Sequence, residues 1–320
     1  MAPLNEIISL TGVTKVFRAA GWKKKTAVND LTLSVASGAT LGLLGPNGSG
    51  KSTTIKMILG FLRPTKGEIL VGGISSDSYR ARALIGYLPE NPRFQRFLTA
   101  ESALHYFGHL NGMSGSALKS RSLELLELVN LSHVRRERVS GFSKGMTQRL
   151  AIAQSLLNRP PILIFDEPMS GLDPLGRIEI RKLIAEIRRN MPRTTIFFST
   201  HILEDVELLC SHVALMKLGN LQTLSTISEL LQNEGQRYQV LIKKPQAQLP
   251  DSLQSSQRET PNELGLILSI DGDQGLYDTL SEIRKAGLTI LSISSERKSL
   301  EQALFSQDDI NRVRQLGGAA

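Results

Sequence analysis

The sequence lacks the features that mark secreted, disulfide-bonded and membrane-spanning proteins. It has one cysteine, Cys210, in 320 residues, so no internal disulfide can form, which fits a reducing compartment. The N-terminal residues show no basic stretch followed by an apolar core, so we expect no secretory signal. No apolar run reaches the roughly 18 residues that a membrane-spanning helix needs. Any role at a membrane therefore calls for a separate membrane partner.

Charge of one sign is in excess, because 38 Lys and Arg face 30 Asp and Glu, a formal net charge of +8. Nucleic acid or an acidic membrane surface would explain the excess, but a solvated surface with spare basic side chains explains it too and is the commoner case. A hydrophobic content of 41% and a charged content of 21% are ordinary for a soluble globular protein. The length allows one large or two modest domains.

Apolar strand-like runs alternate with helix-like periodic stretches, which predicts an α/β fold with a largely parallel sheet. The expected strands are Thr40–Leu44, Ile162–Phe165 and Thr195–Ser199, and the expected helices are Thr53–Leu62, Ala117–Asn130 and Ile178–Arg189.

The composition changes near Gln232, which predicts a first domain at 5–231 and an accessory domain at 232–320. Lys243–Asn262 is rich in Gln, Ser and Pro and is expected to be a loop or linker. The elements expected after it, in a βαβα order, are a strand at Leu266–Ile270, a helix at Gly275–Ala286, a strand at Thr289–Ser294 and a helix at Lys298–Phe305.

A glycine-rich loop between the first strand and the first helix fits the pattern G-x-x-x-x-G-K-[ST] in full. Its residues are Gly45, Pro46, Asn47, Gly48, Ser49, Gly50, Lys51 and Ser52, and Thr53 follows them. Glycines let backbone N–H groups surround phosphate oxygens, and the N-terminus of the next helix attracts the anion. Lys51 would reach the β- and γ-phosphates, and the Ser52 hydroxyl would ligate Mg²⁺. The loop therefore predicts a site for a nucleoside triphosphate with Mg²⁺.

An acidic pair ends the second buried strand. Asp166 is expected to hold Mg²⁺ through water, and Glu167 to polarise an attacking water as general base. Such a pair often only ends a strand, and it gains its significance from the phosphate loop. His201 follows the third strand, at the edge where open α/β sheets bind ligands, and is a candidate for contacting the γ-phosphate. The predicted catalytic residues are Lys51, Glu167 and His201.

The order of these motifs resembles the ATP-binding subunit of ABC transporters. Gly141–Leu150 precedes the acidic strand, and Ser170–Asp173 follows the acidic pair. The resemblance covers Ile8 to Leu221. It implies a P-loop NTPase core with a mostly parallel sheet, a helical subdomain at about 90–160, and a small α+β C-terminal domain.

The resemblance also implies a head-to-tail dimer with two ATP molecules at its interface. Ser143 and Gly145 of one subunit would contact the γ-phosphate held by the other, and such residues at a helix N-terminus suit an anion. Asp173 would lie in the loop that crosses the interface. Phe17 stands where the family stacks an aromatic ring on adenine, with Trp22 as a nearby competitor and core packing as the other role for Phe17.

Three residues depart from the family pattern. Glu90 stands where the family usually has glutamine, and a carboxylate can ligate Mg²⁺ but cannot donate a hydrogen bond. Lys144 replaces the first glycine of the usual Ser-Gly-Gly signature, and Met146 replaces a polar residue. Because Ser143 and Gly145 remain, we expect γ-phosphate binding to survive. Lys144 would either add charge near the phosphates or point to solvent.

The implied function is that of an energy-coupling ATPase at the cytoplasmic face of the membrane. Its expected partners are a separate transmembrane permease and a second ATPase subunit, identical or paralogous, and the C-terminal extension resembles the mostly exporting subgroup. Pro89–Gly115 would receive a coupling helix of the permease. The candidate contacts are Leu98, Tyr106, Phe107 and Leu110, some of which are expected to pack in the core.

Two alternatives stay open. A soluble ABC ATPase could use the positive charge on nucleic acid or ribosomes, but such proteins usually carry two ATPase modules or a long coiled coil, and neither appears here, so nucleic acid is an unlikely partner. The C-terminal domain could instead be a small-ligand or regulatory module.

Overall fold

The computed structural model describes residues 6–18, 24–232, 237–243, 253, 257–259, 265–296 and 300–304. The chain divides into two compact units, Met1–Ile227 and Ser228–Ala320. Within the described ranges, no helix combines the length and the apolar character that crossing a bilayer demands.

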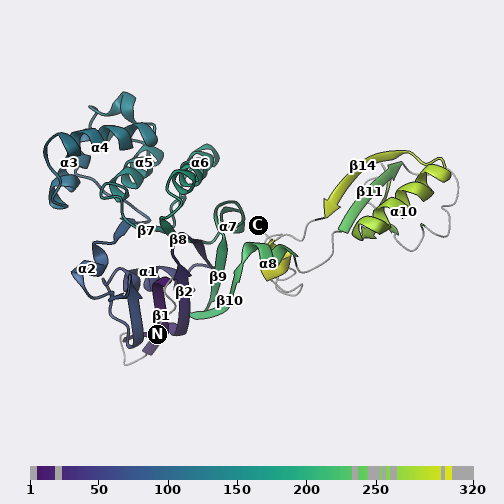
Figure 1. Cartoon of the computed structure of the whole chain (residues 1–320), viewed down its shortest axis with the longest axis horizontal. Helices are drawn as coiled ribbons and strands as arrows, with labels where there is room; N and C mark the ends of the chain where they lie inside the picture. The colour runs from purple at the N-terminus through teal and green to yellow at the C-terminus, as the bar shows by residue number, and fades with distance from the viewer. Residues whose placement is uncertain are drawn as a thin grey trace. The chain divides into compact units, whose positions relative to one another are not determined.

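A six-stranded sheet with the order β10-β9-β3-β8-β7-β6 forms the centre of the first unit (Figure 1). Its strands are β3 (Thr40–Leu44), β6 (Ile85–Leu88), β7 (Ile162–Asp166), β8 (Thr195–Thr200), β9 (His212–Lys217) and β10 (Asn220–Thr226). All neighbours are parallel except β9 and β10. β3, β7 and β8 are buried along their whole length, as continuous apolar runs predict for strands covered on both faces. The predicted α/β fold is confirmed.

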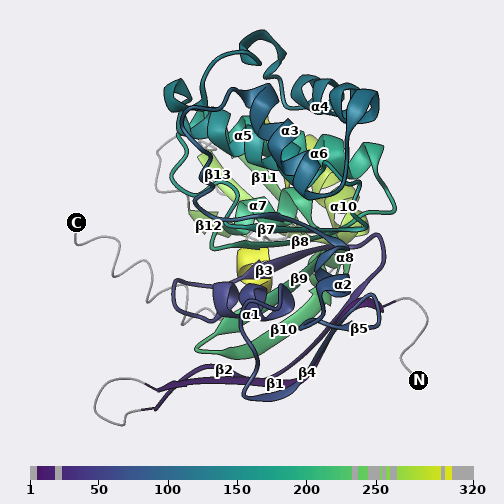
Figure 2. The same ribbon diagram turned by 90° about the vertical axis from the view of Figure 1, so that its left-hand side faces the viewer.

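A second, antiparallel sheet with the order β2-β1-β4-β5 was not predicted from the sequence. Its strands are β1 (Glu6–Arg18), β2 (Lys24–Ala36), β4 (Lys66–Val71) and β5 (Ile74–Ser75). Helix α1 (Lys51–Ile58) lies between this sheet and β3 (Figure 2). One hydrophobic core joins the three layers, with Leu10 and Leu33 from the antiparallel sheet, Ile55 from α1, and Leu41 and Ile164 from the central sheet.

The chain between β6 and β7 is mostly helical. Its helices are α3 (Ala100–Leu110), α4 (Gly115–Leu128) and α5 (Lys144–Ser155), and two 3₁₀ turns lie at Ser132–Val134 and Val139–Gly141. The buried Arg121 of α4 donates hydrogen bonds to the carbonyl oxygens of Leu156 (2.7 Å) and Leu157 (3.4 Å). These carbonyls lie at the end of α5, where the helix itself supplies no donors. Arg121 therefore fixes the C-terminal end of α5.

The remaining helices of the first unit flank its strands. They are α2 (Tyr79–Arg82), α6 (Pro174–Asn190) and α7 (Leu203–Leu209). Helix α8 (Ile227–Gln232) begins at the last residue of the first unit and belongs otherwise to the second. The helix predicted from Ile178 begins earlier, at Pro174, because the Asp173 side chain accepts a hydrogen bond from the Gly176 N–H and caps the first turn.

The second unit contains a four-stranded antiparallel sheet with the order β12-β13-β11-β14 and one long helix. Its elements are β11 (Arg237–Lys243), β12 (Gln257–Glu259), β13 (Gly265–Asp271), α10 (Gly272–Lys285), β14 (Ile290–Glu296) and α11 (Leu300–Leu304). The prediction that Lys243–Asn262 is only a loop is wrong at β12, a strand of three residues, none of them apolar, so no alternating pattern marks it in the sequence. The predicted order also omitted β11, which pairs with both β13 and β14.

Candidate functional site

The glycine-rich loop joins β3 to α1 and is packed too tightly for larger residues at two positions. Gly50 precedes α1 with φ 112°, and a Cβ there would lie 2.6 Å from the Ala27 carbonyl oxygen. A Cβ at Gly45 would collide with the Met216 carbonyl oxygen and the Ser49 side chain. The loop backbone can therefore curl close to its neighbours only because glycine stands at both positions.

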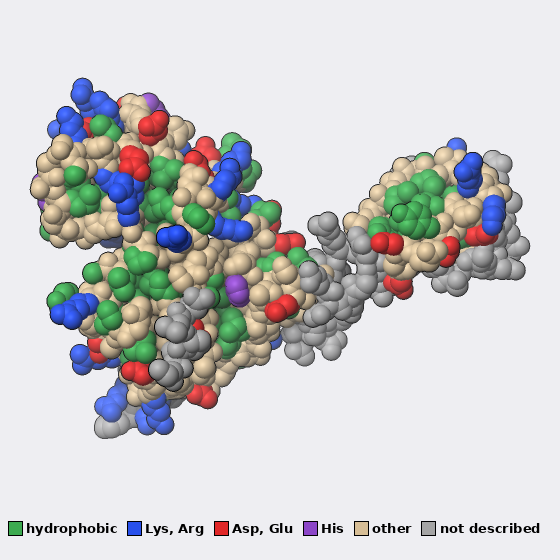
Figure 3. Space-filling model, in the orientation of Figure 1, with side chains coloured by type: hydrophobic (Ala, Val, Ile, Leu, Met, Phe, Trp, Pro, Cys, Tyr) green, Lys and Arg blue, Asp and Glu red, His purple; other side chains and the backbone are tan. Residues whose placement is uncertain are grey.

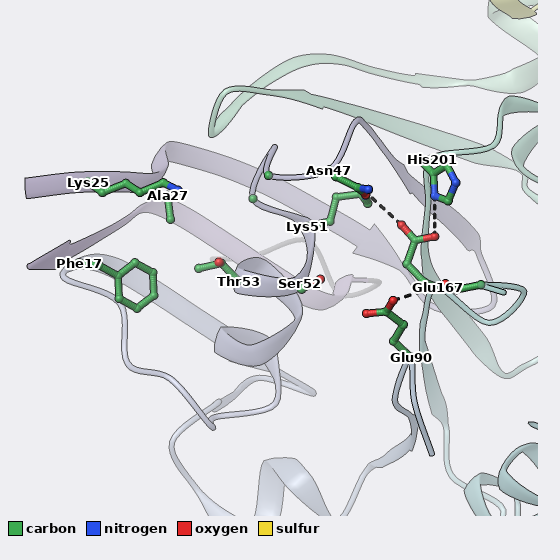
Figure 4. A pocket seen from close by; sticks show the side chains of 13 residues that line it. Phe17, Lys25, Ala27, Asn47, Lys51, Ser52, Thr53, Glu90, Glu167 and His201 are labelled. Carbon is green, nitrogen blue, oxygen red and sulfur yellow. Dashed lines mark hydrogen bonds and ion pairs between the residues drawn. The ribbon is translucent and has the colours of Figure 1, made fainter. Parts of the chain in front are cut away.

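Lys51 is 5% exposed, and its ammonium group lies inside this loop. It donates to the carbonyl oxygens of Gly45 (2.6 Å) and Pro46 (3.3 Å), and its Nζ lies 3.3 Å from Oε1 of Glu167. Figure 4 shows the two side chains pointing toward each other. A buried ammonium held between the loop and a carboxylate is a fixed positive charge at the mouth of the loop.

Asp166 lies at the carboxyl end of β7 and is 4% exposed. Its Oδ1 accepts a hydrogen bond from Ser199 (2.7 Å) and lies 3.5 Å from the Ser52 hydroxyl. Burial raises the pKa of this carboxyl group, the negative charges of Glu90 and Glu167 add to the rise, and the Ser199 hydrogen bond opposes it. A cation beside it would favour the ionised form.

Glu167 adopts a left-handed backbone conformation, φ 47°, which is uncommon for residues with a side chain. Its N–H donates to the Ser199 hydroxyl (3.0 Å), and its Oε2 lies 2.9 Å from Nδ1 of His201. Ser199 thus holds both members of the acidic pair. The carboxylate of Glu167 connects the Lys51 ammonium to the His201 imidazole, as Figure 4 shows.

One pocket of about 420 Å³ brings most of the predicted residues together. It is lined by Phe17, Lys25, Ala27, Asn47, Gly48, Gly50, Lys51, Ser52, Thr53, Glu90, Glu167, Ser170 and His201. Phe17 is 39% exposed and lies at one end of the pocket, far from the carboxylates in Figure 4. Trp22, its competitor, lies outside the described residues. An aromatic face at one end and charged groups at the other suit a ligand with a flat ring and a phosphate chain.

Lys25, Ala27 and Ser170 line the pocket but were not among the predicted site residues. Lys25 comes from β2 and pairs with Phe17 across the β1–β2 ladder. The Ser170 hydroxyl donates to Oε1 of Glu90 (3.4 Å), so a carboxylate at this position is already bonded on one side. The strand pairing that places Lys25 and Ala27 leaves no local pattern in the sequence.

The remaining loop residues and the signature residues do not line the pocket. Gly45, Pro46 and Ser49 belong to the loop, and the Ser49 hydroxyl is buried without a partner among the described residues. Ser143 caps α5 by accepting a hydrogen bond from the Met146 N–H (3.2 Å).

Gly145, Asp173 and Lys144 also lie outside the pocket. Lys144 is exposed, and its ammonium group lies against Gly171. This contact places the Lys144 ammonium group against the loop that precedes α6.

The Ser52 hydroxyl and the Asp166 carboxylate converge on one point, and oxygen ligands of this kind suit Mg²⁺, which keeps several waters or phosphate oxygens of its own. Among the described residues there is no group of three or more His, Cys, Asp or Glu that could hold a metal ion by itself. The donor set therefore fits a magnesium ion that arrives with a phosphate ligand.

Comparison with known proteins identifies relatives along nearly the whole chain. A family described as ABC transporter matches residues 28–170. An ABC transporter ATP-binding protein of Nostoc sp. is 34% identical over 94% of this chain and 89% of its own length. The bacitracin transport ATP-binding protein BcrA of Bacillus licheniformis is 39% identical over 68% of this chain and 69% of its own length. The linearmycin resistance ATP-binding protein LnrL of Bacillus subtilis is 35% identical over 66% of this chain and 68% of its own length.

Among solved structures, a dimeric ATP-binding cassette in a post-hydrolysis state, bound to ADP and Pi, matches with a TM-score of 0.62 and 25% identity. The match covers 69% of this chain and 98% of that one. The structural likeness thus spans one complete cassette.

Proposed function

This chain belongs to the ABC transporter family as an ATP-binding protein with ATPase activity, and we propose that it energises an exporter whose permease is a separate chain. Export is supported by the relatives that serve bacitracin transport and linearmycin resistance. A separate permease is supported by the relatives, whose names describe them as ATP-binding proteins of transporters. The protein would then lie at the cytoplasmic face of the membrane, bound to its permease.

The nucleotide would bind in the pocket with its phosphates on the loop from Gly45 to Ser52 and Thr53, and its base on Phe17. Backbone N–H groups of the loop and the N-terminus of α1 would hold the phosphate oxygens. The Lys51 ammonium would exchange its carbonyl contacts for the β- and γ-phosphates. Phe17 presents the exposed aromatic surface that base stacking needs.

The hydrolytic roles rest on one observation, the chain of contacts from Lys51 through Glu167 to His201. Glu167 would orient the attacking water and accept its proton, since its carboxylate lies between both other groups. His201 would contact the γ-phosphate and keep the Glu167 carboxylate in position beside it. Lys51 would stabilise the charge that develops on the transferred phosphoryl group.

Ser52, Asp166 and Glu90 are the proposed magnesium residues. Bound Mg²⁺ would neutralise phosphate charge and orient the β- and γ-phosphates. Asp166 would bind the ion through a water molecule, because Ser199 holds its carboxylate in place. Glu90 would contribute from the segment that follows β6, where Ser170 holds one of its oxygens.

We propose a head-to-tail dimer, identical or paralogous, on the strength of the dimeric cassette that resembles this chain. Ser143 and Gly145 stand at the start of α5, outside the pocket of their own subunit, so they are free to complete the pocket of a partner. Asp173, at the start of α6, would then lie at the interface, as would the Lys144 ammonium group, which lies against the loop before α6.

The permease is proposed to dock on 89–115. A cleft of about 320 Å³ lies beside this segment, with Tyr87, Pro89, Pro92 and Arg93 in its lining. Tyr106 and Leu110 are 49% and 67% exposed, which leaves them available to a partner. Phe107 packs edge-on against Phe94, and Leu98 is half-buried, so these two serve the core as well.

Fractionation of cells tests the proposal against the alternative of a soluble ATPase on nucleic acid or ribosomes. We expect the chain to sediment with membranes only when its permease is co-produced, and to leave them when Tyr106 and Leu110 are replaced by aspartate. Sedimentation with ribosomes, unaffected by the permease, would favour the alternative. On the face shown in Figure 3, the basic side chains of the first unit are interspersed with acidic and apolar ones, not gathered into a continuous band for a nucleic acid.

A further inference from the structure

The backbone on both sides of His201 is held by a single hydroxyl group. Thr200, the last residue of β8, accepts a hydrogen bond from the Ile202 N–H at its Oγ1 (3.0 Å). The same hydroxyl donates to Oδ2 of Asp205 (3.2 Å). The Thr200 hydroxyl therefore links residues 200 and 202 around His201, and it connects both to the Asp205 carboxylate on α7.

The other oxygen of that carboxylate is held by an arginine from a different helix. Oδ1 of Asp205 lies 2.7 Å from Nε and 2.6 Å from Nη2 of Arg181, on α6. Asp205 is 1% exposed, whereas Glu204, which also contacts Arg181 at 2.8 Å, has a side chain that is 65% exposed. The buried carboxylate has partners at both oxygens, which offsets the large cost of burying a charge.

The network also reaches the phosphate loop. Gly45 is the first residue of the loop, and its N–H donates a hydrogen bond to the carbonyl oxygen of Thr200 (3.3 Å). A second arginine of α6, Arg188, donates to the carbonyl oxygen of Leu209 at the end of α7 (2.8 Å). The short helix that follows His201 is thus fixed to α6 near both of its ends, and the residue before His201 is fixed to the loop.

We propose that Asp205, held by Arg181 and acting through Thr200, is a positioning residue that sets the His201 imidazole against Glu167. None of these three side chains lines the nucleotide pocket, so their effect on hydrolysis passes through the His201 turn. The proposal rests on the hydrolytic role proposed for His201. It adds that α6, which is capped by Asp173 in the proposed interface, fixes the geometry of that histidine.

The consequence is a change in turnover without a change in nucleotide affinity. If the turn loosens, the imidazole leaves the 2.9 Å contact with Glu167 while the loop and Lys51 keep the phosphates. Small misplacements of this kind reduce rates by about 10- to 100-fold. A fall in kcat with an unchanged KM is the signature of an interaction that matters in the transition state only.

Two matched pairs of variants test this. Thr200→Val removes the hydroxyl and keeps the shape, while Thr200→Ser keeps the hydroxyl. Asp205→Asn removes the buried charge, while Glu204→Gln removes the exposed one. We expect kcat for ATP to fall about 10- to 100-fold in Thr200→Val and Asp205→Asn, with KM within about twofold, and both controls to match the wild type. Wild-type kcat in the first two variants would overturn the proposal.

A double variant separates positioning from general destabilisation. In a His201→Ala background, Asp205→Asn should cause no further loss of kcat, because the residue acts through a group that is already gone. A further loss of the same size as in the single variant would show that Asp205 serves the fold and not His201. Arg181→Lys, which keeps a cation for Asp205, is the variant to use should Asp205→Asn fail to fold, and it should give a smaller fall in kcat at the same KM.

The proposed role of His201 can fail separately. If His201→Ala hydrolyses ATP at the wild-type rate, the hydrolytic assignment is wrong, whatever Asp205 does. The NMR chemical shifts of the imidazole groups then still test the geometry, since the chain has five histidines to assign. Thr200→Val should shift the His201 signal and leave those of the other four unchanged, and an unshifted His201 would refute the positioning.

Discussion

Lys51 carries a buried positive charge whose present partners are two carbonyl oxygens and the carboxylate of Glu167. Replacing it with alanine should lower ATP hydrolysis by at least about 100-fold, because the developing phosphate charge loses its fixed cation. Steady-state phosphate release measures this. Lys56→Ala, an exposed lysine of the same helix, is the control and should keep the wild-type rate. Normal turnover in Lys51→Ala would remove the basis for placing phosphate on this loop.

Asp166 has a raised pKa because it is buried beside other carboxylates. Above its folded-state pKa the ionised form is costly, so this residue opposes folding at neutral pH, and the penalty disappears as the pH falls and the carboxyl group takes up a proton. Asp166→Asn should therefore raise the urea midpoint of the nucleotide-free protein at pH 7, and the gain should shrink toward acidic pH.

The exposed Asp77, paired with Arg63 at the surface, is the control for this pH series. Asp77→Asn should leave the midpoint unchanged, since exposed ion pairs contribute little. A gain in Asp166→Asn that grows as the pH falls would contradict the assignment. A stabilised but inactive variant is the expected result for a residue that serves binding at the expense of the fold.

At the scale of single elements, Arg121 holds the far end of the helix whose start carries Ser143 and Gly145. Arg121→Met leaves the Leu156 and Leu157 carbonyls without their donor and should destabilise the protein by about 2–4 kcal/mol. Urea unfolding measures the loss, and the exposed Lys119→Met on the same helix should show none. Faster amide exchange confined to α5 would locate the effect, and an unchanged midpoint would contradict it.

The elements that could be predicted from the sequence are those whose pattern is local. β3, β7 and β8 are continuous apolar runs, and the loop at 45–52 is contiguous, so strand and motif were visible together. β1 and β2 are long, half-exposed and bent by register shifts, and β12 has three residues, so none gives a clear period.

The same distinction holds for the site. Lys51, Glu167 and His201 lie in recognisable motifs, whereas Lys25 and Ala27 reach the pocket through the pairing of β1 with β2. Arg181 and Asp205 meet across two helices that are separated by a strand. Contacts made by tertiary pairing leave no mark on either segment alone, so only the fold could show them.

At the scale of the whole molecule, the proposed dimer makes the behaviour of Glu167→Gln diagnostic. Glutamine keeps the size of the side chain but cannot accept the proton of the attacking water, so ATP should stay bound and hold two subunits together. Sedimentation with Mg²⁺ and ATP should show a dimer, and the same variant combined with Lys51→Ala should stay monomeric. Only monomers in Glu167→Gln would count strongly against the paired arrangement.

The two units have separate hydrophobic cores, and every residue of the nucleotide pocket belongs to the first. A chain that ends at Gln232 should therefore bind Mg²⁺ and ATP as tightly as the full-length protein. Fluorescent nucleotide titration measures this. A clear loss of affinity would show that the C-terminal unit supports the site, and unchanged transport would exclude an essential role for it.

The pairing of Phe17 with Lys25 has a consequence for how this sequence can change over time. The aromatic ring faces the pocket because of ladder register, and a slip by one residue would turn it to the opposite face of the sheet. Insertions or deletions between residues 18 and 24 leave that register intact as long as this pair is kept. We therefore expect natural variants to differ freely in length there, while a single added residue within Val13–Phe17 should abolish the proposed stacking of Phe17 on the base.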